Sequence, residues 1–227
     1  MKKLALALLL VCCFWSTYLW AEENQPTKKF ASGIFSLGGG GFFPGGDLNS
    51  DFYNSTYTSF NSGKGFDTGY NVTFSGGATL GRFLGVGIDV SYRQAEQKYI
   101  TGYAFTYNNQ TNTLRTGGLE YLAYFQPNDW RVQPYIAVGF GSYFNNLDTW
   151  QSMELDNGFG FGYGVVAKAG IRFFITEHFF LGGYAKYFTD WTTYKIYYIN
   201  NYGNSYSDNK IIDLGGLVAN FELGVKF

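Results

Sequence analysis

Apolar residues alternate with polar or small residues along eight successive stretches of the chain, and a period of two is typical of β-strands. The last stretch shows it most clearly, because every second residue from Leu217 to Phe227 is apolar. The eight stretches cover residues 30–42, 70–83, 86–93, 113–125, 132–143, 159–173, 179–188 and 215–227. In the first stretch two registers stay open: Phe35 and Leu37 favour one face, whereas Phe30 and Ile34 favour the other.

The connections between these stretches alternate between long and short. Four long polar segments lie at about residues 44–69, 94–112, 144–158 and 189–210, and short turns join the remaining stretches. An even number of strands, with short turns at one end and long loops at the other, is the pattern of a transmembrane β-barrel. In such barrels the turns are periplasmic and the loops are external. We therefore predict an all-β fold, an eight-stranded antiparallel up-and-down transmembrane β-barrel over residues 22–227.

The composition agrees with a barrel in lipid. Aromatic residues make up 21% of the chain and charged residues only 15%, against about 25% charged residues in ordinary soluble domains. The mean hydropathy is nevertheless only −0.12. A membrane barrel explains both values, because each strand offers only every second residue to the lipid.

The first 21 residues have the layout of a cleavable signal peptide. Lys2 and Lys3 precede an apolar segment at residues 4–14, and Ala21 supplies the small residue required for cleavage. Both cysteines, Cys12 and Cys13, lie inside this segment, so the mature chain is predicted to have no thiol chemistry. Whether one of them is lipidated stays open. Removal of the segment leaves 14 basic and 17 acidic residues, a balance that does not favour nucleic-acid binding.

Charged residues fall mainly on the parity opposite to the apolar one. A lysine or arginine facing lipid at mid-bilayer costs about 2–4 kcal/mol, so we predict that these charges face the barrel interior. Side chains fill the interior of an eight-stranded barrel, and buried charges there must be paired. The predicted interior charge network comprises Asp89, Arg93, Glu120, Lys168, Arg172, Lys186, Glu222 and Lys226.

Two segments and the terminus resemble the small outer-membrane barrels grouped around OmpA, OmpX and OmpW. Residues 134–141, Pro-Tyr-Ile-Ala-Val-Gly-Phe-Gly, are similar to a P-Y-x-x-x-G-x-G strand of that superfamily, and residues 164–174 resemble its following strand. The terminal apolar residues resemble the signal read by the outer-membrane assembly machinery; they are Phe221, Leu223, Val225 and Phe227. The resemblance covers almost all of the mature chain. It implies a location in the bacterial cell outer membrane, with lipid, lipopolysaccharide and the assembly machinery as partners.

The sequence offers no constellation for catalysis. His178 is the only histidine and falls in a predicted tight turn, without a carboxylate and nucleophile placed beside it. We therefore expect no enzymatic activity, no cofactor and no metal site. The long loops are rich in Tyr, Asn, Ser and Gly, which suit adaptable binding surfaces, so we predict surface loops acting in adhesion, host interaction or envelope integrity. The alternative is a narrow porin or an OmpW-like channel for small hydrophobic solutes, suggested by a glycine-lined interior with Val166, Tyr184 and Val218.

Overall fold

The computed structural model describes residues 31–46, 66–103, 106–148, 154–155, 158–199 and 205–227. The predicted signal peptide and Phe30 lie outside these residues. The strands are β1 (Ala31–Pro44), β2 (Gly69–Leu80), β3 (Leu84–Tyr103), β4 (Thr106–Phe125), β5 (Val132–Asp148), β6 (Glu154–Leu155), β7 (Phe159–Phe174), β8 (Phe179–Phe188), β9 (Trp191–Ile199), β10 (Ser205–Asp213) and β11 (Gly216–Lys226). The described residues contain no helix that is long and apolar enough to span a membrane.

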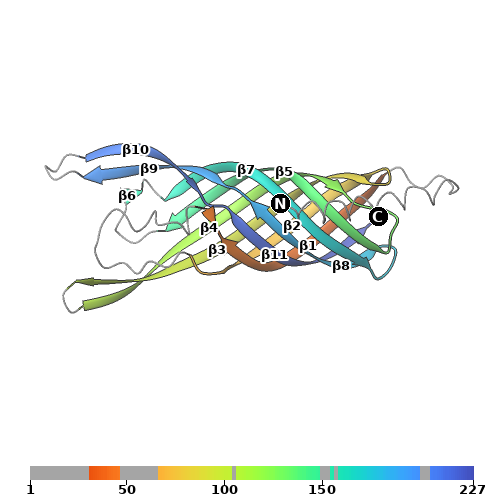
Figure 1. The fold of residues 1–227 in the computed structure, drawn as a ribbon, viewed down its shortest axis with the longest axis horizontal. Helices are drawn as coiled ribbons and strands as arrows, with labels where there is room; N and C mark the ends of the chain where they lie inside the picture. The colour runs from red at the N-terminus through yellow and green to blue at the C-terminus, as the bar shows by residue number, and fades with distance from the viewer. Residues whose placement is uncertain (1–30, 47–65, 104–105, 149–153, 156–157, 200–204) are drawn as a thin grey trace, which may run out of the picture. The chain divides into compact units, whose positions relative to one another are not determined.

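Within the described residues, eight strands close into a ring in which every neighbouring pair is antiparallel (Figure 1). The order around the ring is β1, β2, β3, β4, β5, β7, β8 and β11. β11 then pairs with β1, so the last strand meets the first, with Phe35 opposite Val225. Such closure leaves no open sheet edge around the barrel wall. The predicted fold, an eight-stranded antiparallel barrel, is confirmed.

Two of the eight strands continue past a local interruption. β9 extends β8, and β10 extends β11, because the pair Phe188–Gly216 and the pair Trp191–Asp213 share one register. At the interruption the Asp213 carboxylate accepts hydrogen bonds from the backbone N–H groups of Asp190 and Gly215, both at 2.9 Å. A side-chain oxygen thus satisfies backbone donors that would otherwise lack a ladder partner.

The strands run further than the sequence predicted. β3 and β4 pair out to Tyr103 and Thr106, through most of the segment predicted as a loop at 94–112. β9 and β10 likewise occupy most of 189–210, and β5 continues to Asp148. Residues 94–112 lack the alternation of apolar and polar residues on which the strand prediction depended, whereas their backbone pairing continues. Of the predicted loop at 44–69, residues 47–65 lie outside the described part.

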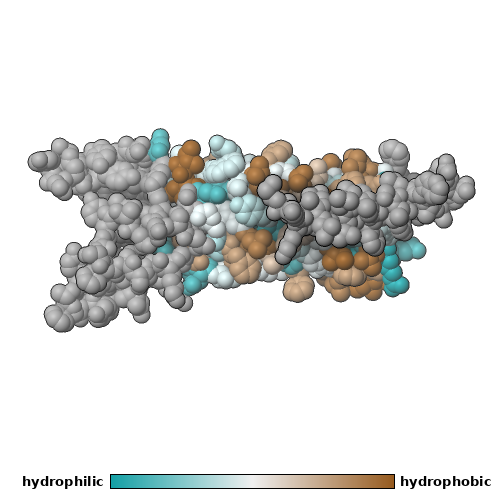
Figure 2. Space-filling view, in the orientation of Figure 1, coloured by the Kyte–Doolittle hydropathy of each residue, from teal (hydrophilic) through white to brown (hydrophobic). Residues whose placement is uncertain are grey.

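The barrel wall presents apolar side chains outward. In β1, Phe35 and Leu37 are 44% and 57% exposed whereas Ile34 is 7% exposed, which decides the register that the sequence left open. Figure 2 shows apolar residues over the outer face of the barrel. Monomeric soluble proteins rarely expose so large a contiguous apolar surface, so this outer face suits contact with lipid.

Candidate functional site

Five charged side chains from four strands form a continuous chain of ion pairs inside the barrel. Their order is Arg93, Glu120, Lys186, Asp89 and Lys168. Arg93 bonds to Glu120, whose other oxygen lies 2.7 Å from Lys186 Nζ. Asp89 Oδ2 lies 4.0 Å from Lys186 Nζ and 2.9 Å from Lys168 Nζ. None of these side chains has exposed surface, so their charges depend on one another rather than on water.

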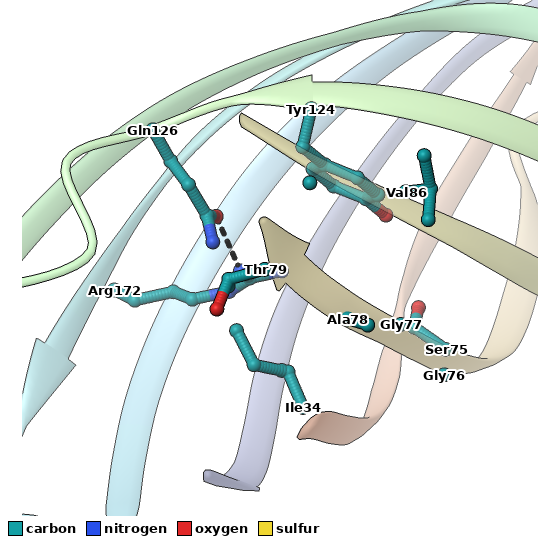
Figure 3. Close-up of a pocket in the computed structure, with 11 residues that line it drawn as sticks. Ile34, Ser75, Gly76, Gly77, Ala78, Thr79, Val86, Tyr124, Gln126 and Arg172 are labelled. Carbon is teal, nitrogen blue, oxygen red and sulfur yellow. Dashed lines mark hydrogen bonds between the residues drawn. The ribbon is translucent and has the colours of Figure 1, made fainter. Parts of the chain in front are cut away.

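A second ion pair lies nearer to the short turns. Arg172 Nε is 3.0 Å from Glu222 Oε1, which also accepts a hydrogen bond from the Tyr135 hydroxyl at 3.1 Å. Arg172 Nη1 donates to Gln126 at 2.9 Å, the bond dashed in Figure 3, and Ser36 donates to Glu222 at 3.2 Å. Arg172 and Gln126 border a cavity of about 20 Å³, which is room for about one water molecule.

Aromatic rings complete the packing around the buried cations. The Lys168 ammonium lies 4.0 Å from the ring centroid of Tyr184, and the guanidinium of Arg172 lies 4.3 Å from that of Tyr135. The Arg93 guanidinium lies 3.8 Å from the Phe188 ring. Such cation–π contacts contribute more when desolvated, about 2 kcal/mol each. Ion pairs and rings together occupy the interior at mid-barrel.

A cluster of buried polar side chains lies beyond Phe188, toward the strand extensions. Asn145 donates to Asp190 at 2.9 Å and to Thr192 at 2.6 Å, and it accepts from Thr116 at 2.6 Å. Asp190 and Thr192 have no exposed surface. The sequence pattern does not reveal this cluster, because Asp190 and Thr192 lie within the segment predicted as a loop at 189–210.

The structure separates Lys226 from the other predicted interior charges. Its ammonium donates to the backbone carbonyl of Asn128 at 2.6 Å, in the turn between β4 and β5. The sequence does not predict this separation of Lys226, because Lys226 has the same parity as Glu222. The structure therefore brings together seven of the eight predicted residues, in two groups.

The terminal residue closes the barrel seam. Phe227 exchanges two backbone hydrogen bonds with Gly33, at 2.9 and 3.1 Å, and its ring stacks on Phe35 with centroids 5.6 Å apart. Phe221 and Leu223 point outward from β11 and are 84% and 57% exposed, so they stand free for contact with lipid or protein. Recognition of these residues by the assembly machinery stays a proposal.

The described residues hold no group of three or more His, Cys, Asp or Glu side chains that is able to bind a metal ion. His178 lies exposed in the turn before β8, where its Nδ1 is 2.9 Å from the Lys226 carbonyl oxygen. That contact ties the turn to the end of β11. The arrangement of the interior is suited to filling a barrel and to holding its strands together.

Comparison with known proteins places this architecture among bacterial outer-membrane proteins. Residues 31–226 match a family model described as outer membrane protein beta-barrel domain. The crystal structure of the outer membrane protein OprG from Pseudomonas aeruginosa is similar, with a TM-score of 0.58 and 14% sequence identity. The match covers 90% of this chain and 99% of OprG. At this identity the likeness is one of fold.

Two further solved barrels are similar over nearly their whole length, with lower TM-scores. Neisserial surface protein A (NspA) has a TM-score of 0.49 at 12% identity, and the match covers 87% of this chain and 98% of NspA. The outer membrane protein AlkL has a TM-score of 0.48 at 15% identity, covering 91% of this chain and 96% of AlkL. No curated protein matches the sequence significantly.

Proposed function

Because the chain belongs to the outer membrane protein β-barrel family, we propose that it is a non-enzymatic surface protein whose extended hairpins make contacts outside the cell. These contacts serve adhesion, host interaction or envelope integrity. The protein is located in the bacterial outer membrane, where lipid surrounds its apolar wall. Family membership alone does not separate a surface-binding role from a channel, so the proposal depends on the barrel's interior and on its hairpins.

The observation that carries the proposal is the contrast between a filled interior and extended hairpins. The chain of ion pairs from Arg93 to Lys168 crosses the barrel with no exposed surface. A narrow channel, the alternative, requires these buried pairs to separate, and breaking such a pair costs about 3–5 kcal/mol. A filled barrel is better suited to carrying a rigid support than to passing solute.

The hairpins supply the binding surface. Beyond Glu96 and Thr113, β3 and β4 pair only with each other among the described residues. Figure 1 shows this hairpin and the β9–β10 hairpin projecting from the same end of the barrel. Both hairpins are continuous with barrel strands. Their backbones therefore lose little conformational entropy when a partner binds, which favours affinity.

Truncation of the hairpins tests this role. Gln97 and Asn112 form a cross-strand pair bonded at 3.1 Å, so residues 98–111 are replaceable by Asn-Gly, which favours a tight hairpin turn. Tyr194 and Lys210 allow the same replacement of residues 195–209. We expect cells that display either truncated barrel to bind plates coated with extracellular-matrix proteins about tenfold less than wild type, equivalent to ~1.4 kcal/mol.

The control for this experiment is the barrel itself. Both truncated proteins should migrate in unheated electrophoresis as folded barrels, because neither replacement removes a pair in the closed ring. Matrix binding equal to wild type by both folded truncated proteins would contradict the proposed role of the hairpins.

A further inference from the structure

The outer wall carries a groove that crosses four strands, with a volume of about 680 Å³. Its floor is one cross-strand row of residues at interior-facing positions of the strands: Gly77, Gly87, Leu122 and Gly139. At these positions only backbone lies on the outer side of the sheet, because Leu122 points inward and the three glycines have no side chain. The groove spans three strand spacings of about 4.8 Å, so it is ~14 Å long.

The two sides of the groove differ in height. One side is a row of short side chains, Ala78, Val86, Ala123 and Val138. On the other side Ile88, Tyr121 and Phe140 stand side by side, and the rings of Tyr121 and Phe140 stack with centroids 5.3 Å apart. At the β2 position of this second side stands Gly76, opposite Ile88. The groove is therefore lined by apolar residues along its length, which suits a hydrocarbon chain.

The groove lies in the half of the bilayer next to the short turns. Ala78 precedes the end of β2 by two residues, and Val138 follows the start of β5 by six. A tilted strand climbs ~2.5 Å per residue, so the groove rises from about 5 to about 15 Å above the turns. The hydrocarbon core is ~30 Å thick. Since short turns face the periplasm in this class of barrel, the groove faces the phospholipid leaflet.

A cation lies beyond the lower end of the groove. Arg82 is in the turn after β2, and its guanidinium carbon lies 5.2 Å from the ring centroid of Phe83. Phe83 stacks on Phe125, with ring centroids 6.0 Å apart. Phe125 is the next residue after Ala123 on the outer face of β4. This position is at headgroup level, where guanidinium groups bind phosphate oxygens well.

We propose that this groove is a binding site for one phospholipid of the periplasmic leaflet, with an acyl chain in the groove and its phosphate at Arg82. At this depth the membrane contains the phospholipid of the periplasmic leaflet and not lipopolysaccharide. The groove's length matches the extent of an acyl chain through half of the hydrocarbon core. Bound lipid covers the backbone at the floor of the groove.

Native mass spectrometry of the full barrel, refolded in detergent with dipalmitoyl phosphatidylglycerol, tests the site. We expect retained lipid on the wild type and about tenfold weaker retention by the double variant A78F/A123F, whose rings fill the groove. Arg82→Gln, which leaves the groove open, should weaken retention about threefold through the lost phosphate contact. Ala185→Phe is the matched control, because Ala185 faces outward on β8, between Ala169 and Ala219.

Each other outcome overturns the proposal. Equal lipid retention by wild type, A78F/A123F and Ala185→Phe would show that the groove is not the site. Retention of lipid A in place of phosphatidylglycerol would assign the site to the other leaflet. If A78F/A123F instead removed a dimer, the groove would be a contact between two copies. Unheated electrophoresis establishes that each variant is folded, and Ala123→Leu serves as a milder substitution.

Discussion

Replacing Glu120 with glutamine is expected to destabilise the barrel by about 3–5 kcal/mol, the typical cost of leaving buried charges without their partner. Glu120 has no exposed surface and bonds to both Arg93 and Lys186. Glutamine has nearly the same shape, so the substitution removes charge with little change in packing. Urea unfolding of the refolded barrel in lipid vesicles measures the loss as a shift in the transition midpoint.

The control for this variant is Glu96→Gln. Glu96 is exposed on the same hairpin, and an exposed carboxylate contributes about 0–1 kcal/mol. Adding Lys186→Met to Glu120→Gln should recover part of the stability, because it removes a buried cation that has lost its nearer carboxylate and keeps only Asp89 at 4.0 Å. Equal midpoints for the Glu120 and Glu96 variants would show that the ion pairs do not hold the barrel together.

Replacing Phe227 with alanine is expected to separate folding from assembly. In purified protein the variant should lose about 0.5–1.5 kcal/mol, the value of one aromatic pair, because its ring stacks on Phe35 while its backbone bonds to Gly33 survive. In cells, if the terminus is also the assembly signal, the amount of folded protein in the outer membrane should fall at least about thirtyfold, equivalent to ~2 kcal/mol and more than the lost aromatic pair explains. Quantitative immunoblots of outer-membrane fractions measure this amount.

Phe140→Ala provides a matched comparison. Phe140 is 62% exposed and Phe227 is 61% exposed, and each ring stacks on one aromatic neighbour. The two variants should therefore lose similar stability in vesicles, and only the Phe227 variant should be depleted from the membrane. Depletion of both to the same degree would reduce the role of Phe227 to packing alone.

The parity of the strands was predictable from the sequence because a single energetic rule governs it. Placing Lys168 or Arg172 against lipid costs about 2–4 kcal/mol each, so the alternation of β7 fixes which face is inside. Both side chains lie buried in the structure. The seam between the first and last strands follows from the even number of strands and the antiparallel order, which is why closure was also foreseeable.

Other features leave no periodic signal. Residues 94–103 form a paired strand without an apolar face. Their side chains therefore show no alternation from which the strand could be predicted. Tyr135 and Gln126 complete the surroundings of Arg172 and Glu222, but a neutral polar residue at an inner position costs little and predicts nothing about its partners. Lys226 is separated from the other charges because it donates to the Asn128 carbonyl in the turn between β4 and β5. These two residues are far apart in the sequence, so the contact could not be predicted.

We infer that the barrel is filled and that it serves as a support for its hairpins. Single-channel recording in planar lipid bilayers, with the purified full barrel reconstituted in the membrane, tests this inference. We predict no conductance steps, because the ion pairs among Arg93, Glu120, Lys186 and Asp89 close the interior. Reproducible steps from folded wild-type protein, with a conductance that changes in Glu120→Gln, would contradict this account and establish a channel through the barrel.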